Sequence, residues 1–217
     1  MPRSGVRVPP GPLFFIHGWG FSSKVLAQIP GVDLPFHGRS SLTYKGLWSL
    51  ARDLALMAQP GSVLVGWSMG ASLCLMMAYL FPERFRALLL IGATPCFKKS
   101  WEEKNIRGFY LRLRREKEVF LKEFRRLALG KDFEDNLELE KALEMLKEFV
   151  ELDLTPLVPY VKPPVVLLHG VYDPIVPFSS GVALYSMLRK AIFIPFAGGH
   201  FPHEGLILKV LKGLQNL

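Results

Sequence analysis

Residues 62–81 read SVLVGWSMGASLCLMMAYLF, and they give the clearest indication of the fold class. Ser62 to Gly66 predicts a short buried strand, and Ala71 to Phe81 predicts an almost wholly apolar helix that ends at Pro82. The G-x-S-x-G motif at 66–70 joins the two. A strand-to-helix turn of this kind exposes a serine hydroxyl for attack, so Ser68 is the candidate nucleophile. The alternative is a glycine-rich turn with a capping serine.

Further strands and helices alternate on both sides of this stretch. Alternation of this kind predicts a mostly parallel sheet with helices on both faces. The other expected strands are 13–16, 31–34, 87–91, 165–168 and 191–194. The other expected helices are 22–29, 47–59, 101–129, 136–151, 179–189 and 204–215.

A serine hydroxyl needs an adjacent base at neutral pH, and His200 is the best placed of the five histidines. His200 follows the last predicted strand and three small residues. In G-x-S-x-G enzymes the chain order is serine, acid, histidine, which places the base here. His203 is the alternative, but it lies past Pro202 near the start of the last predicted helix.

The acid that would orient His200 is Asp173. It follows the predicted strand 165–168, where it can accept the imidazole N–H and hold the tautomer that takes the serine proton. The alternative role is a turn residue ahead of Pro174, which is compatible with the catalytic one. Asp33 and Asp153 are competitors in the wrong part of the chain order.

Attack on a carbonyl builds negative charge on its oxygen, which fixed N–H groups stabilise. We expect one donor to be the backbone N–H of Met69, directly after the candidate nucleophile. The second should come from His17-Gly18-Trp19-Gly20, after the first strand, and we assign it to the N–H of Trp19. His17 is expected to fix this loop by hydrogen bonds rather than act as a base.

Residues 98–155 have a different composition from the rest and predict a helical lid inserted into the core. Residues 98–130 contain eleven Lys/Arg and five Asp/Glu, whereas residues 131–155 contain three and nine. At 100° per residue the first helix has an apolar face, expected over the catalytic pocket, formed by Phe109, Leu113, Phe120, Phe124 and Leu127. We expect Trp19, Phe120 and Phe124 to bind substrate.

The opposite face of that helix is basic: Arg107, Arg114, Arg115, Lys122, Arg125 and Arg126. Two interpretations compete for it. The simpler is a solvated helix side or one that is ion-paired with the acidic second helix. The other is a dock for an acidic acyl-carrier protein, since clustered arginines suit phosphate and carboxylate groups.

Five motifs together resemble the α/β-hydrolase carboxylesterases, over about residues 13–205: HGWG at 17–20, DLPFHGRS at 33–40, GWSMG at 66–70, PERF at 82–85 and PCF at 95–97. Within that superfamily the chain is most similar to the biotin-pathway esterases that act on pimeloyl-acyl-carrier-protein methyl ester. The resemblance implies an α/β-hydrolase fold and ester hydrolysis through an acyl-enzyme, with no metal or organic cofactor.

The chain also departs from that family. Only twelve residues precede the first strand, where the family has two more strands, so we expect N-terminal strands to be missing or shortened. The segment before Asp33 is shorter than usual, and DLPFHGRS replaces DLPGxGRS. Other functions therefore stay open: a short-chain esterase, a thioesterase, a C–C hydrolase, a menaquinone-pathway lyase or a non-catalytic binding protein.

The bulk composition adds further expectations. The length of 217 residues suits one domain, with a core at 13–97 and 156–217 and a disordered tail at 1–12. Two cysteines, no signal-like segment and no membrane span favour a cytoplasmic monomer. The net charge of +8 lies mainly in the first lid helix, and no motif indicates nucleic-acid binding.

Overall fold

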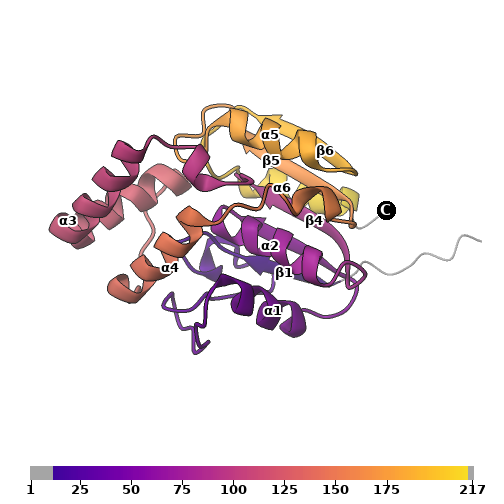
Figure 1. Ribbon diagram of the computed structural model, residues 1–217, viewed down its shortest axis with the longest axis horizontal. Coiled ribbons are helices and arrows are strands. Elements are labelled where there is room, and N and C mark those ends of the chain that lie inside the picture. The colour runs from indigo at the N-terminus through magenta and orange to yellow at the C-terminus, as the bar shows by residue number, and fades with distance from the viewer. Residues whose placement is uncertain (1–11, 215–217) are drawn as a thin grey trace, which may run out of the picture.

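The computed structural model describes residues 12–214, and a parallel β-sheet runs through its centre (Figure 1). Within these residues, six strands lie in the order β2-β1-β3-β4-β5-β6, and each neighbouring pair is parallel. Because the strands run the same way, their carboxyl ends meet at one edge, where open α/β sheets form their sites. The strands are β1 (Leu13–Ile16), β2 (Gly31–Val32), β3 (Ser62–Trp67), β4 (Phe85–Ile91), β5 (Val165–Gly170) and β6 (Ala191–Phe196).

Both faces of the sheet are covered by helices. Because side chains alternate along a strand, Leu88 and Leu90 of β4 pack into one apolar cluster while Leu89 and Ile91 pack into the other. The first cluster includes residues of α1 (Leu47–Met57), α2 (Met69–Leu80) and α5 (Phe178–Met187). The second includes residues of η1 (Ser23–Leu26) and α6 (Glu204–Leu214). The strands are apolar on both faces because both faces are buried.

Between β4 and β5 the chain leaves the sheet and forms the helical insertion, residues 98–155. Its main helices are α3 (Glu103–Leu129) and α4 (Leu139–Glu151), flanked by the short helices η2 (Phe97–Lys99) and η3 (Val158–Tyr160). Figure 1 shows α3 projecting at one end of the molecule, on the left, with α4 between it and the sheet-covering helices. The insertion therefore lies to one side of the sheet rather than extending it.

Helix α3 is not the uninterrupted helix that the sequence predicts. Lys117 has φ +32° and ψ −104°, which breaks the helix near its middle. A single helical wheel therefore does not describe residues on both sides of the break. Arg125, predicted on the basic face, is 6% exposed, whereas Leu127, predicted on the apolar face, is 55% exposed. Both assignments are wrong for this reason.

Most predicted elements are confirmed, with shifts at their ends. Helix α2 begins at Met69, directly after the candidate nucleophile, instead of Ala71. The strand predicted at 31–34 is limited to Gly31–Val32, and the second insertion helix begins at Leu139 instead of 136. The tail predicted at 1–12 lies, except for residue 12, outside the described residues. Within residues 12–214, no helix is long and apolar enough to cross a membrane.

Candidate active site

The turn between β3 and α2 holds Ser68 in a conformation that residues other than glycine rarely adopt. Its φ is +56° and its ψ is −119°, so the backbone is strained at the candidate nucleophile. The flanking glycines are required by space. A Cβ on Gly66 would lie 2.6 Å from the Cα of Ala71, and one on Gly70 would lie 2.1 Å from the carbonyl oxygen of Ile16. The G-x-S-x-G spacing thus lets strand, helix and β1 meet behind the serine.

His200 and Asp173 form a buried hydrogen-bonded pair at the carboxyl ends of β5 and β6. The Nδ1–H of His200 donates to Oδ2 of Asp173 at 2.7 Å. The other carboxylate oxygen of Asp173 accepts the backbone N–H groups of Ile175 and Val176, both at 2.8 Å. The imidazole lies against Gly92, where a Cβ would be 2.7 Å from its Cε1. The ring is therefore held on two sides.

The surroundings of Asp173 keep its carboxyl ionised. Burial by itself opposes ionisation, but the charge and hydrogen bond of His200 and the two backbone N–H groups outweigh it. The net result is a pKa of Asp173 below its ordinary value. When the imidazole carries a single proton, an ionised acceptor at Nδ1 holds that proton there and leaves Nε2 as the acceptor. His200 and Ser68 line the same cavity.

The loop at 17–20 is held by two buried histidines. His17 bonds the carbonyl of Gly18 through Nδ1 at 2.8 Å and accepts the N–H of Leu34 at Nε2 at 2.9 Å. His37 accepts the N–H of Gly20 at Nε2 at 3.0 Å and bonds a carbonyl at its own Nδ1. In both rings Nδ1 donates and Nε2 accepts, which requires neutral imidazoles. The expected role of His17 in fixing this loop agrees with these bonds.

Burial keeps both of these histidines neutral. Loss of solvation lowers the pKa of His17 to about 4 and the pKa of His37 to about 3. At His17 the nearby carboxylates Asp33 and Asp135 raise the pKa, but by less than burial lowers it. Charge repulsion from His17 adds to the effect at His37, whose ring centroid lies 5.3 Å away. Neither ring contacts the cavity that holds Ser68, so both act as supports of the loop.

The two predicted oxyanion donors flank the serine. A Cβ on Gly18 would lie 3.1 Å from the Cβ of Ser68, so the loop that includes Trp19 packs directly on the nucleophile turn. Met69 is the first residue of α2, where a backbone N–H has no partner within the helix. Among residues 12–214, the N–H of Trp19 has no hydrogen-bond acceptor. Within the described residues both N–H groups are therefore unpaired.

The cavity beside Ser68 is almost wholly apolar. Its empty volume is about 560 Å³, which includes open solvent at the mouth. Trp19 and Phe124 line it as predicted, whereas Phe120 does not: it packs behind Phe109, with the Arg112 guanidinium 4.2 Å from its ring centroid. Phe109, from the apolar face predicted to cover the pocket, lines it too. The lining residues that the sequence did not indicate include Trp101, Ile106, Tyr110, Leu146, Phe149 and Val150. Leu146, Phe149 and Val150 share the apolar face of α4. Their helical spacing in the sequence could have indicated that this face also lines the cavity.

The six predicted basic dock residues do not form one surface. Arg125 is buried and donates to the carbonyl oxygens of Gly20 at 2.6 Å and Asp135 at 3.0 Å, so it supports the loop at 17–20 instead. Three others pair with carboxylates: Arg107 with Glu103 at 3.6 Å, Lys122 with Glu134 at 3.7 Å and Arg126 with Asp132 at 3.7 Å.

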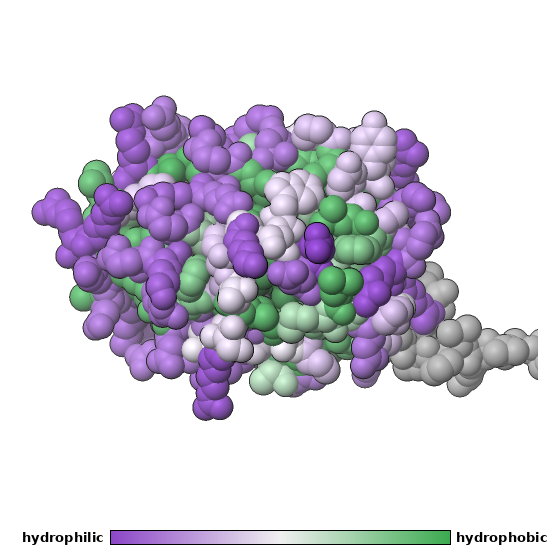
Figure 2. Space-filling view, turned by 60° about the horizontal axis from the view of Figure 1, so that its bottom comes forward, coloured by the Kyte–Doolittle hydropathy of each residue, from purple (hydrophilic) through white to green (hydrophobic). Residues whose placement is uncertain are grey.

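Arg114 and Arg115 are exposed, and no carboxylate within the described part of the chain pairs with them. Figure 2 shows hydrophilic side chains gathered on the left, the end of the molecule that holds α3, whereas apolar residues surface further right. Within residues 12–214 no cluster of histidine, cysteine and carboxylate side chains has the arrangement of a metal site.

Comparison with known proteins agrees with this geometry. Residues 13–205 match the model of the "Alpha/beta hydrolase family". The chain is 26% identical over 238 aligned positions to a pimeloyl-[acyl-carrier protein] methyl ester esterase of Wigglesworthia glossinidia brevipalpis, covering 92% of both chains. It is 28% identical over 199 positions to the esterase of the same name from Salmonella newport, covering 76% of this chain and 77% of the relative.

Solved structures share the fold at low sequence identity. An esterase from Exiguobacterium antarcticum is similar with a TM-score of 0.78 at 17% identity, covering 95% of this chain and 91% of that one. A hydrolase from Oleispira antarctica gives a TM-score of 0.77 at 15% identity, covering 95% and 92%. With the family match across nearly the whole described core, these findings lead to one conclusion: the chain belongs to the α/β-hydrolase family.

Proposed function

We propose that this chain is a serine carboxylesterase that works through an acyl-enzyme. Ser68 is the nucleophile, His200 the general base and Asp173 the orienting acid. The observation that carries the proposal is the buried His200–Asp173 hydrogen bond of 2.7 Å beside a serine on a positive-φ turn. His200 and Ser68 border one cavity, which brings base and nucleophile to the same substrate.

The chemistry proceeds in two halves. Ser68 Oγ attacks the ester carbonyl while its proton moves to Nε2 of His200, and the N–H groups of Trp19 and Met69 stabilise the oxyanion. Collapse of the tetrahedral intermediate expels the alcohol, which takes the proton from His200. Water then loses a proton to His200 and attacks the acyl-enzyme. The second collapse returns the proton to Ser68 and releases the carboxylic acid.

We further propose that residues 98–155 act as a lid and that the substrate is the methyl ester of a pimeloyl group on acyl-carrier protein. The names of the two relatives and the apolar cavity, which suits a medium acyl chain, support this assignment. Arg114 and Arg115 are the exposed guanidinium groups of the insertion that are free to meet an acidic carrier. A general short-chain esterase is the second candidate, favoured by the three basic residues that are already ion-paired.

Labelling with a fluorophosphonate tests the nucleophile. The wild type should gain one adduct, located at Ser68 by mass spectrometry, and Ser68→Ala should gain none while keeping the same melting temperature. An unlabelled wild type, or equal labelling of the variant, would leave a non-catalytic binding protein as the better explanation.

Charge reversal tests the carrier. Arg114→Glu with Arg115→Glu should lower kcat/KM for the carrier-bound ester by about tenfold, in a salt-dependent way, and leave a free short methyl ester unaffected. Arg52→Glu, an exposed change on α1, is the matched control. If the double variant slows both substrates equally, or neither, the docking proposal is wrong and the short-chain assignment stands.

A further inference from the structure

One polar atom in the cavity wall has no partner. The hydroxyl of Tyr110, on α3, is the sole buried side-chain nitrogen or oxygen within residues 12–214 that makes no hydrogen bond. Tyr110 is one of the residues that line the cavity of Ser68 and His200. A buried hydroxyl without a partner loses its hydrogen bonds to water without replacement, so a native structure that keeps one calls for an explanation.

The tryptophan N–H groups of this wall, by contrast, all have hydrogen-bond partners. The indole N–H groups of three tryptophans each donate to a backbone carbonyl: Trp19 to Ala142 at 2.7 Å, Trp67 to His200 at 3.1 Å and Trp101 to Ile175 at 2.6 Å. These groups anchor the wall and offer nothing to a ligand. Among these residues that line the cavity, Tyr110 therefore differs in having an unused donor.

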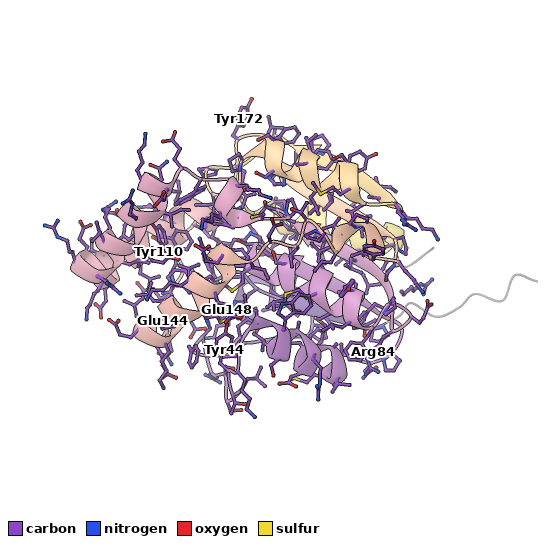
Figure 3. The ribbon with its side chains drawn as sticks, viewed as in Figure 1. Tyr44, Arg84, Tyr110, Glu144, Glu148 and Tyr172 are labelled. Carbon is purple, nitrogen blue, oxygen red and sulfur yellow. The ribbon has the colours of Figure 1, made fainter. Side chains whose placement is uncertain are left out.

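The surroundings of Tyr110 restrict the ligand group that it can bind. Burial, with the nearby carboxylates Glu151 and Glu144, raises the pKa of Tyr110 to about 12, so the hydroxyl keeps its proton at neutral pH. Figure 3 shows Tyr110 and Glu144 at the same end of the molecule, on neighbouring helices α3 and α4. Negative charge from α4 disfavours a ligand carboxylate here. A neutral oxygen acceptor fits, and a carbonyl is the strongest such acceptor in an acyl substrate.

We propose that the Tyr110 hydroxyl donates a hydrogen bond to a second, neutral carbonyl on the acyl chain, away from the ester that Ser68 attacks. This inference rests on the proposed esterase activity and specifies its substrate class: acyl esters with a distant carbonyl rather than plain alkyl esters. An alkyl chain leaves the hydroxyl unpaired in the complex, and a site built to hydrogen-bond discriminates against a ligand that lacks the acceptor.

Two series of methyl esters, matched in chain length, test the proposal. One is the methyl n-alkanoates, and the other is the dimethyl esters of linear dicarboxylic acids, which have a second carbonyl and no charge. The wild type should favour the diester at one chain length by about three- to tenfold in kcat/KM, as a neutral hydrogen bond allows. Tyr110→Phe should abolish that preference, so that its ratio of diester to alkanoate kcat/KM is about the same at every chain length.

The control is Tyr160→Phe, which removes a hydroxyl from a residue that is 62% exposed and outside the cavity. It should change neither series. If Tyr110→Phe lowers both series equally, or leaves the diester preference intact at every length, the inference is wrong while the esterase function stands. If the wild type hydrolyses neither series, the proposed esterase function is wrong, and the inference that rests on it is wrong too. Melting temperatures of the variants separate either result from loss of fold.

Discussion

The strand-end site and the helical insertion differ in what holds their side chains in place. At the strand ends, Ser68 and His200 come from loops that directly follow β3 and β6, and parallel pairing brings those loops together. In the insertion, side-chain positions follow from packing against the core. Arg114 and Arg125 belong to one helix, yet Arg114 is exposed, whereas Arg125 is buried and donates hydrogen bonds to two backbone carbonyl oxygens. Local sequence thus determines the first region far more than the second.

The largest expected effect lies in the strand-end site. Asp173→Asn should lower kcat on p-nitrophenyl butyrate by about 10⁴-fold with little change in KM, because the amide stabilises the wrong tautomer of His200. Steady-state kinetics check this, and circular dichroism should show an unchanged fold. Asp153→Asn, on the exposed side of the insertion, is the control. A loss of less than about tenfold would mean that Asp173 does not orient the base.

The next effect tests whether the insertion supports the site. Arg125→Met should lower the free energy of unfolding by about 2–4 kcal/mol, since it leaves the carbonyls of Gly20 and Asp135 without their donor. Denaturant titration measures this, and kcat should also fall as the loop at 17–20 loosens. The matched change Arg114→Met should stay within about 0.5 kcal/mol. If the two variants lower the free energy of unfolding equally, Arg125 does not support the loop at 17–20 in the way described.

Acid should weaken the loop through its two histidines. His17 and His37 have depressed pKa values of about 4 and about 3, so the unfolded chain binds more protons than the folded one below about pH 6.5. The contribution of the two histidines to the free energy of unfolding is therefore fully present above that pH. It declines as the pH falls toward 4, by up to about 1.4 kcal/mol per pH unit for each histidine. Denaturant titrations at several pH values measure the slope. His37→Gln should reduce it, and an unchanged slope would exclude this origin.

The smallest effect concerns the break in α3. Lys117→Gly should raise the free energy of unfolding by roughly 0.5–1 kcal/mol, because glycine adopts a positive φ without strain. Lys122→Gly, at an ordinary helical position of the same element, should instead lower it by about 1 kcal/mol. Thermal unfolding compares the two variants. If both are destabilising, residue 117 is an ordinary helical position in solution.

Much of the strand-end site could be predicted from sequence because each motif reports a local requirement. Gly66 and Gly70 are needed where backbones approach within van der Waals contact, and this spacing marks the turn on its own. The sequence also placed Asp173 and His200 after the correct strands. The cavity wall was harder to predict: Phe120 was assigned to it and Tyr110 was not, although both lie on one helix. No proline or glycine marks the break at Lys117, so a helical wheel drawn from the sequence treats the helix as continuous.

Local patterns in the chain predict the alternation of strands and helices, the turn at Ser68 and the chain order of the proposed nucleophile, acid and base. These depend on chain-local periodicity, on glycine and proline, and on the rule that parallel strands end at one edge. Three features became visible only once the chain was folded: which insertion residues face the cavity, that Arg125 supports the loop at 17–20, and that Tyr110 keeps an unpaired hydroxyl. Those outcomes depend on how α3 and α4 pack across long sequence separations, which no local pattern encodes.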